Sequence, residues 1–139
     1  MQIVEITDAD VPVVVDLWHR CGLTRPWNDP VSDIAFARGN PSSTVLLGRI
    51  AERIIASAMV GFDGHRGWIY YLGVDPEFQR QGLGRGMMEA AEQWLRARRA
   101  PKLQLMIRDG NVAATAFYEA LGLERQPVIT MGKRLDTEG

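Results

Sequence analysis

The residues best suited to chemistry form a glycine-rich loop at residues 79–86, between a predicted strand and a predicted helix. Gly82, Gly84 and Gly86 remove side chains where another backbone or a phosphate must come close, and glycine accepts positive φ. The first turn of a helix offers backbone N–H groups without internal partners, and it carries partial positive charge. Arg80 and Arg85 can add charge-assisted hydrogen bonds. The loop therefore predicts a cradle for a diphosphate.

Two well-known phosphate-binding loops do not fit this sequence. A P-loop needs Gly-Lys-Ser/Thr where the helix starts, and the sequence has Gly-Arg-Gly there. A dinucleotide-binding loop needs a third glycine where Met87 stands, and its strand opens a βαβ unit near the N-terminus. A tight strand-to-helix connection that binds nothing remains an alternative, so the interpretation depends on the surrounding elements.

The elements that must position the loop mix helices and strands. The patterns predict strands at residues 2–6, 44–50, 54–62, 68–74, 103–107 and 128–135. They predict helices from Thr7 to about Cys21, at residues 31–38, from the loop to about Arg99, and up to Gly122. The third helix is predicted to turn a mostly apolar face inward: Met87, Met88, Ala91, Trp94 and Leu95. Strand hairpins in the middle of the chain favour a mixed α+β fold over a doubly wound sheet.

Composition predicts one globular domain, residues 1–139, with 46% hydrophobic and 24% charged residues. A net charge of −1 and a pI near 6.1 argue against nucleic acid or an anionic membrane as partner. The single Cys21 excludes an internal disulfide and a cysteine-based metal cluster, so no metal is expected. The N-terminus does not resemble a signal peptide, and no stretch approaches the roughly 20 apolar residues that span a bilayer. We expect a soluble, cytoplasmic protein.

Two motifs about thirty residues apart make the interpretation of the loop more specific. Residues 79–84 read Gln-Arg-Gln-Gly-Leu-Gly and follow Tyr-Leu-Gly-Val-Asp-Pro at residues 71–76. Asn111 is then followed by Phe-Tyr-Glu-Ala-Leu-Gly-Leu at residues 117–123. In both motifs, and in the order of its elements, the chain resembles the GNAT N-acetyltransferase superfamily. Residues 25–30 and 63–67 also look like those of one bacterial subgroup.

The resemblance implies a fold and a reaction. The fold would be a central, mixed, mostly antiparallel sheet flanked by about four helices, with a coenzyme A cleft beside the central strand. The reaction would be transfer of acetyl from acetyl-CoA to a primary amine, by direct attack in a ternary complex. The acceptor would be a small molecule or a protein, and homodimers are common in the family. A non-catalytic acyl-CoA-binding module is the alternative.

The resemblance also implies roles for particular residues. Contacts to coenzyme A fall on the central strand, the loop and the last helix: Leu72, Gly73, Val74, Gln79, Arg80, Gln81, Gly82, Leu83, Gly84, Arg85, Gly86, Asn111, Phe117 and Tyr118. Tyr118 matches the tyrosine that can protonate the leaving thiolate, although it could instead flank the apolar stripe of its helix. Asn111 could bind the pantetheine arm or cap the last helix.

The general base stays unassigned at this level. The positions that hold glutamate in many family members are Trp68 and Met106, which cannot accept a proton. The base is then a water chain or one of four side chains: Asp63, His65, Tyr70 and Tyr71. His65 has a suitable intrinsic pKa but lies in a predicted turn, where an exposed or structural role is the alternative.

The acceptor amine is expected near residues that wall its site in the family. Trp27, Asn28 and Asp29 fall between the first two helices, and Asp63 and Tyr70 complete the predicted acceptor contacts. Asp29 could attract a cationic amine and Trp27 could offer its ring face to one. A rigid turn bounded by prolines, with a buried tryptophan, is the alternative for residues 26–30.

Overall fold

The computed structural model describes residues 1–136 and divides the chain into two compact units. The first unit, Met1–Met106, holds the sheet and three α-helices, and the second begins at Ile107 and holds one. The glycine-rich loop lies within the first unit, whereas Asn111, Phe117 and Tyr118 lie in the second.

A five-stranded sheet forms the centre of the first unit. Its strands follow one another in sequence order: β1 (Gln2–Glu5), β2 (Ser43–Ile50), β3 (Arg53–Phe62), β4 (Gly67–Val74) and β5 (Leu103–Leu105). The first four are antiparallel neighbours, and β5 runs parallel to β4. The predicted mixed, mostly antiparallel sheet is thereby confirmed.

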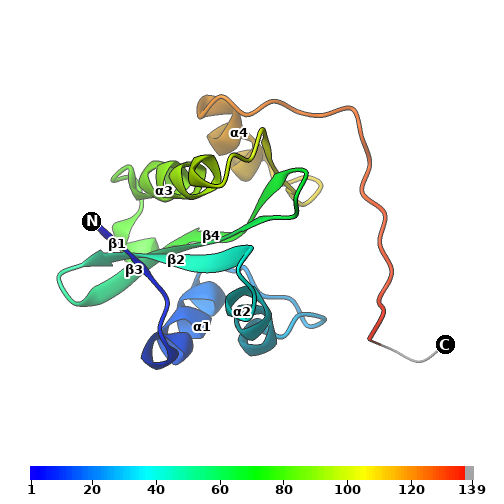
Figure 1. Ribbon diagram of the computed structural model, residues 1–139. Coiled ribbons are helices and arrows are strands. Elements are labelled where there is room, and N and C mark those ends of the chain that lie inside the picture. Colours follow the sequence, from blue (N-terminus) through cyan, green and yellow to red (C-terminus); the bar gives the residue numbers. More distant parts are fainter. Residues whose placement is uncertain (137–139) are drawn as a thin grey trace. The chain divides into compact units, whose positions relative to one another are not determined.

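Helices cover both faces of this sheet, as Figure 1 shows. On one face lie α1 (Val11–Arg20) and α2 (Pro30–Arg38), and on the other lies α3 (Leu83–Ala97). Two 3-10 turns, η1 (Asp8–Asp10) and η2 (Pro76–Phe78), lead toward α1 and α3. Asp10 caps this first turn, because the Thr7 N–H and hydroxyl both donate to its carboxylate at 2.8 Å.

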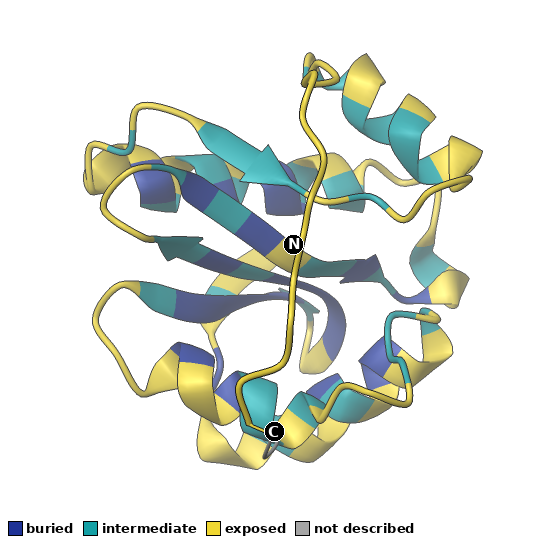
Figure 2. Cartoon of the chain, turned by 90° about the vertical axis from the view of Figure 1, so that its right-hand side faces the viewer, coloured by how far each residue is buried: buried dark blue, intermediate teal, exposed yellow. Residues whose placement is uncertain are grey.

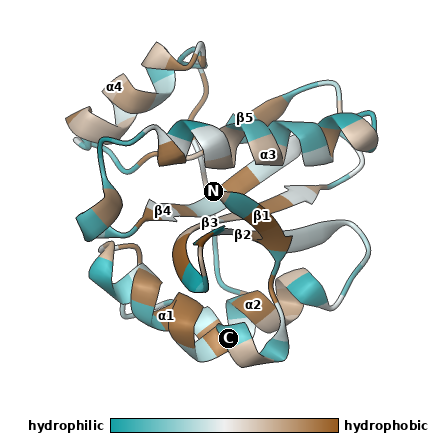
Figure 3. Ribbon diagram, turned by 90° about the vertical axis from the view of Figure 1, so that its left-hand side faces the viewer, coloured by the Kyte–Doolittle hydropathy of each residue, from teal (hydrophilic) through white to brown (hydrophobic). Residues whose placement is uncertain are grey.

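The core follows from the apolar periodicity of the helices and strands. Val14, Leu17 and Trp18 of α1 are completely buried, in keeping with their i, i+3, i+4 spacing. Figure 2 shows the buried stretches along the inner strands of the sheet, and Figure 3 shows hydrophobic and hydrophilic residues alternating around the helices. Four of the five residues predicted to face inward from α3 are buried, and Trp94 is the half-buried exception.

The second unit contains α4 (Val112–Ala120), and its remaining described residues, 107–111 and 121–136, form no helix or strand. The strand predicted at residues 128–135 was therefore wrong. Its apolar residues are exposed, with Ile129 at 85% and Met131 at 86%. Alternating apolar residues favour a strand only where a neighbouring edge accepts the backbone hydrogen bonds, and Pro127 and Gly132 further weaken the pattern.

Candidate functional site

The glycine-rich loop leaves β4 through η2 and turns into α3. Arg80 and Gly82 both have positive φ, at 64° and 75°. This left-handed region costs energy for a residue with a side chain, and such conformations concentrate at ligand-binding sites. Gly82 is the N-cap residue of α3, so its freedom from a Cβ lets the chain enter the helix sharply.

The N-terminus of α3 carries no side-chain cap. Asp29 caps α2 by accepting from the Ser32 N–H at 3.2 Å, and Asn111 caps α4 by accepting from the Ala114 N–H at 3.1 Å. Gly82 has no side chain to offer, and the first turn of α3 contains no acidic residue. The first amides of α3 are therefore available to an anionic ligand, at the positive end of the helix dipole.

A buried carboxylate anchors the start of this loop. Asp75 is completely buried and accepts from Arg20 at 2.7 Å, from Arg53 at 3.4 Å and from the Glu77 N–H at 2.9 Å. Burial alone would raise the pKa of Asp75, but the bonds from Arg20 and Glu77 and the two guanidinium charges outweigh it, so the pKa lies below its ordinary value. The exit from β4 is thus tied to α1 and β3.

One edge of β4 is open along its second half. β5 pairs only with Gly67, Trp68 and Ile69, although β4 continues to Val74. Within residues 1–136, no strand pairs with this edge beyond Ile69. The free backbone groups there can accept and donate hydrogen bonds to a ligand lying alongside, as an added strand would.

A bulge interrupts β4 beside this open edge. Ser57 pairs with Gly73 and Met59 pairs with Tyr70, so Tyr71 and Leu72 together oppose a single residue of β3. Tyr71 has a φ of 51°, which is unusual for an aromatic residue in a strand. A bulge removes backbone groups from the ladder and re-aims side chains, and bulges are frequent beside active sites.

The side chain of Tyr71 joins four elements of the first unit. Its hydroxyl donates to Asp33 Oδ2 at 2.6 Å, and its ring stacks on Trp18 with centroids 3.8 Å apart and planes at 3°. The Trp18 indole N–H donates to Ser57 Oγ at 2.8 Å, and the Ser57 hydroxyl donates to the Tyr71 carbonyl at 2.9 Å. Residues of α1, α2, β3 and β4 thereby hold the bulge in one conformation.

This network also fixes the protonation of the phenol. Burial, followed by the hydrogen bond to Asp33 and the charges of Asp33 and Asp29, raises the pKa of Tyr71 above its ordinary range. Tyr71 therefore stays protonated and donates, so it is not a base near neutral pH. Asp33 is the acceptor, and within the described residues its second oxygen, Oδ1, has no recorded donor.

The predicted acceptor wall between α1 and α2 is solvent-exposed. The side chain of Trp27 is 55% exposed, and Asn28 and Asp29 are exposed beside it, so a buried tryptophan is not observed. Asp29 caps α2, and hydrogen bonds from the Ser32 N–H and hydroxyl lower its pKa. A capping role and an acceptor role are compatible, because the ionised carboxylate also faces solvent.

The β3–β4 turn lies far along the strand from the bulge. Asp63 accepts from the N–H groups of His65 and Arg66 at 2.8 Å each, and these bonds lower its pKa. His65 is exposed in this turn. Six residues separate it from Tyr71, which at the rise of a strand is about 20 Å. Tyr70 is 42% exposed, and burial, followed by the charge of Asp63, raises its pKa.

In the second unit, α4 carries the remaining predicted residues. Asn111 caps the helix through its side-chain oxygen. Burial raises the pKa of Tyr118 to about 12, so the phenol is neutral through the physiological range. Phe117 meets the Tyr118 ring edge-on, with centroids 5.0 Å apart and planes at 73°.

Comparison with known proteins decides the family. The sequence model of the Acetyltransferase (GNAT) family matches residues 11–123. An acetyltransferase of Pectobacterium atrosepticum is 42% identical over 97% of this chain and 96% of its own length. The chain belongs to the GNAT acetyltransferase family. It is an acetyl-CoA-dependent acyltransferase, and the resemblance inferred from its two motifs is confirmed.

Solved structures of GNAT acetyltransferases share the fold. The Escherichia coli ribosomal-protein-S18-alanine N-acetyltransferase superposes with a TM-score of 0.75 at 27% identity, over 87% of this chain and 76% of that one. An aminoglycoside 6'-N-acetyltransferase of type Iy, solved with the bisubstrate analogue CoA-S-monomethyl-acetylneamine, gives 0.80 at 16% identity, over 96% and 97% of the two chains. The second likeness concerns the fold alone.

The described residues also bear on two other classes of site. Among residues 1–136 of this GNAT acetyltransferase, no group of three or more His, Cys, Asp or Glu side chains is arranged to hold a metal ion. No helix within the same residues is long and apolar enough to cross a membrane.

The uncapped α3 amides and the open edge of β4 are the features of the first unit that could hold acetyl-CoA. Sequence reasoning missed Asp33 and Ser57. Asp33 reads as an acidic residue in the first turn of a helix, and Ser57 as a small residue in a buried strand. Only the pairing of β3 with β4 and the packing of α2 against the sheet reveal that both touch Tyr71.

Proposed function

We propose that this GNAT acetyltransferase transfers acetyl from acetyl-CoA to a primary amine of a small cationic molecule, by direct attack in a ternary complex. The observation that carries the proposal is that three structural features follow one another along β4. An open edge and a bulge lead into an anion-binding helix terminus that no side chain caps. The Asp33–Tyr71 pair lies at the same bulge, on the side of α2.

The loop and the strand have separate tasks in binding. The amides at Gly82 to Gly86 hold the diphosphate, with Arg80 and Arg85 adding charge, and the contacts proposed for residues 79–86 belong to this group. The backbone of Leu72, Gly73 and Val74 holds the pantetheine arm by strand-like hydrogen bonds. Acetyl-CoA supplies a thioester, and an N–H group released by the bulge donates to its carbonyl oxygen as negative charge develops.

The amine is bound on the α1–α2 side. The carboxylates of Asp33 and Asp29 attract its ammonium form, and the exposed Trp27 ring offers a face for it. Asp33 orients the amine while a water carries its proton away, because a carboxylate is too weak a base to hold that proton alone. The free amine then bonds to the carbonyl carbon, and the carbon–sulfur bond breaks. Tyr118 donates its hydroxyl proton toward the departing thiolate, and the nitrogen gives up its second proton through water, which restores the Tyr118 phenol.

A two-part experiment tests this function. Release of the coenzyme A thiol is followed with acetyl-CoA and a panel of polyamines, aminoglycosides and amino-acid amides, and products are identified by mass. We expect saturable kinetics with at least one cationic amine and a product heavier by one acetyl group. Saturable binding of acetyl-CoA by calorimetry without transfer to any amine would instead favour the non-catalytic acyl-CoA-binding module.

A further inference from the structure

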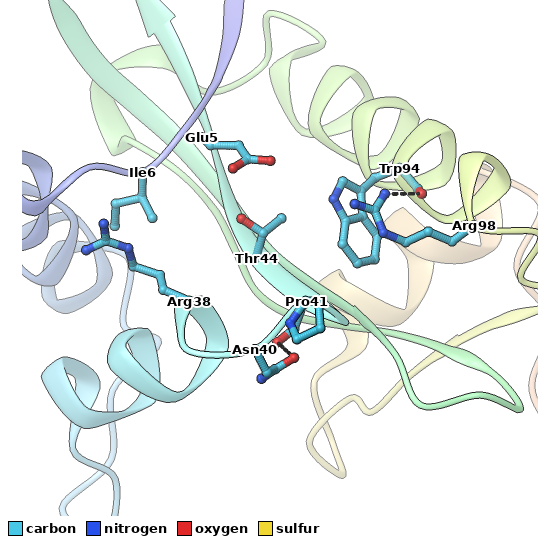
Figure 4. Close-up of a pocket in the computed structure, with 9 residues that line it drawn as sticks. Glu5, Ile6, Arg38, Asn40, Pro41, Thr44, Trp94 and Arg98 are labelled. Carbon is cyan, nitrogen blue, oxygen red and sulfur yellow. Dashed lines mark hydrogen bonds between the residues drawn. The ribbon is translucent and has the colours of Figure 1, made fainter.

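A cavity separate from the acetyl-CoA elements opens where the end of β1 and the start of β2 meet the last turns of α3 (Figure 4). Its volume of about 330 Å³ is at the lower end of small-ligand sites. Trp94 of α3 and Arg98, the residue after that helix, line it, and α3 begins at Leu83. At the rise of an α-helix, Trp94 lies about 16 Å from Leu83, so this cavity is distinct from the phosphate loop.

Some polar groups around the cavity already have partners within the protein. Arg38 is paired with Asp8 at 2.7 Å. Asn40 Oδ1 accepts from the hydroxyls of Ser42 and Ser43, and the Ser43 hydroxyl also approaches the Ala37 carbonyl at 2.8 Å. These groups shape the wall and contribute little to recognition of a ligand.

The indole N–H of Trp94 lacks any partner. Its nitrogen is buried, and within residues 1–136 nothing accepts its hydrogen. A buried donor left without an acceptor is destabilising. In Figure 4 the indole nitrogen lies on the side of the ring that is turned toward Thr44 and Glu5. A ligand with a hydrogen-bond acceptor at this point would therefore satisfy the indole N–H.

Opposite charges flank that donor. The guanidinium of Arg98 stacks on the Trp94 ring at 3.4 Å and donates to the Trp94 carbonyl at 3.0 Å, which fixes its position. Its remaining N–H groups form no recorded ion pair with the described carboxylates. Glu5 lines the cavity from β1 and likewise has no recorded ion pair with a described cation. Thr44, only 8% exposed, lies beside Glu5 in Figure 4.

We propose that this cavity binds a free α-amino acid. The carboxylate of the ligand accepts from the Trp94 N–H and from Arg98, and its ammonium group donates to Glu5. A zwitterion satisfies both charges and the unpaired donor together, whereas a simple amine or a simple carboxylate satisfies only one side. Glu5 and Arg98 are both exposed to solvent, so a zwitterion in the cavity replaces water at both charges at once.

The indole N–H gives a direct readout by NMR. The four tryptophans yield four indole signals, and Trp94→Phe assigns the one of interest. L-alanine is titrated into the protein. Propionate and ethylamine are titrated separately, because each carries only one of the two charged groups of the amino acid. We expect a saturating shift of the Trp94 signal with L-alanine and binding at least about 10-fold weaker with either of these two compounds, the equivalent of 1.4 kcal/mol. A Trp94 signal that does not move with L-alanine overturns the proposal.

Charge variants separate this site from the acetyl-CoA site. Arg98→Gln and Glu5→Gln should each weaken L-alanine binding about 10-fold or more. Arg99→Asn removes a neighbouring positive charge outside the cavity and should leave it unchanged. Acetyl-CoA affinity, measured by calorimetry, should be the same in all three variants. Equal L-alanine binding by Arg98→Gln and the unaltered protein would refute the site, whatever the outcome for acetyl transfer.

Discussion

The hydroxyl of Tyr71 donates to the Asp33 carboxylate at 2.6 Å, although 38 residues separate the two along the chain. Tyr71 stands at the bulge of β4, where positive φ turns its side chain against Trp18 and toward α2. The same residue therefore shapes the backbone proposed to bind the thioester and orients a carboxylate on the proposed acceptor side. The proposed binding sites for the thioester and for the amine therefore adjoin at this pair.

Replacing Asp33 by Asn should impair use of the cationic amine while sparing acetyl-CoA. Asn keeps the shape and can still accept from Tyr71, but it loses the charge that attracts an ammonium group. Hydrogen bonds to charged groups contribute roughly 1.5–3 kcal/mol, so kcat/KM for the amine should fall about 10- to 100-fold. Steady-state kinetics with varied amine at saturating acetyl-CoA measure the change.

Glu89→Gln is the matched control, because it removes one exposed carboxylate from α3. It should leave the amine kinetics within about 2-fold of the unaltered enzyme. The kcat/KM for the amine in Tyr71→Phe should lie between the values for Asp33→Asn and Glu89→Gln. In this variant Asp33 keeps its charge but loses the donor that orients it. Amine kinetics unaffected by Asp33→Asn would exclude Asp33 from acceptor binding.

Gly82→Ala should weaken acetyl-CoA binding. A Cβ at Gly82 meets nothing within 4 Å, so the cost comes from its φ of 75° and from a methyl group beside the diphosphate. We expect the Kd for acetyl-CoA, measured by calorimetry, to rise about 10-fold. Gly64 has a φ of 92° and equally open space in the β3–β4 turn. Gly64→Ala therefore carries a comparable backbone cost, and it should leave the Kd unchanged.

Local patterns in the sequence predicted most elements of the first unit. The alternation and turn residues around Asp63, and the i, i+3, i+4 spacing around Trp18, are local properties that the fold preserves. The strand expected at residues 128–135 failed because a strand depends on a partner edge, which a single segment does not encode. Elements defined by their own periodicity were predictable, and an element defined by its neighbour was not.

The candidate site, too, was predictable only in part. The loop around Gly82 could be predicted, since its glycines and the following helix are contiguous in sequence. The contact between Asp33 and Tyr71 could not, because it depends on how α2 packs against β4 and on one extra residue in the β4 ladder. Bulges leave no reliable mark in a single sequence, whereas helix N-termini do.

Asp75→Asn should destabilise the protein and flatten its stability at acid pH. Asp75 joins two partly exposed arginines, Arg20 and Arg53, from a completely buried position, so loss of these charged hydrogen bonds should cost about 2 kcal/mol at neutral pH. The pKa of Asp75 is lowered in the folded protein. Its stabilising effect is therefore fully present above the ordinary pKa near 4 and disappears as pH falls through the folded value. Urea unfolding at neutral pH and near pH 3 should show the difference between the proteins shrinking.

Glu77→Gln provides the comparison for that experiment. Glu77 shares Arg53 with Asp75 but is 69% exposed, and exposed pairs contribute roughly 0–1 kcal/mol. We expect only a small loss in the free energy of unfolding at neutral pH. A loss equal to that of Asp75→Asn would mean that the exposed pair, and not the buried carboxylate, stabilises the loop exit.

Tyr118→Phe should lower turnover without changing acetyl-CoA affinity. The variant keeps the ring and its edge-on contact with Phe117 and removes only the hydroxyl. A phenol with a pKa of about 12 is a weak acid for a thiolate, so the expected loss in kcat is about 10- to 100-fold, below the upper range of general acid catalysis. Single-turnover kinetics isolate the chemical step. Unchanged turnover would remove Tyr118 from the mechanism.

The same variant should gain relative stability at alkaline pH. The folded protein holds the pKa of Tyr118 at about 12, while an unfolded tyrosine ionises near 10. The folded state therefore favours the neutral phenol, and this contribution is fully present below pH 10 and is lost as pH rises toward 12. At about pH 11 the unaltered protein should have lost about 1 kcal/mol more than Tyr118→Phe, relative to their difference near pH 8. The comparison isolates Tyr118, since both proteins keep Tyr70 and Tyr71. A difference that stays constant across this range would show that Tyr118 is not desolvated in solution.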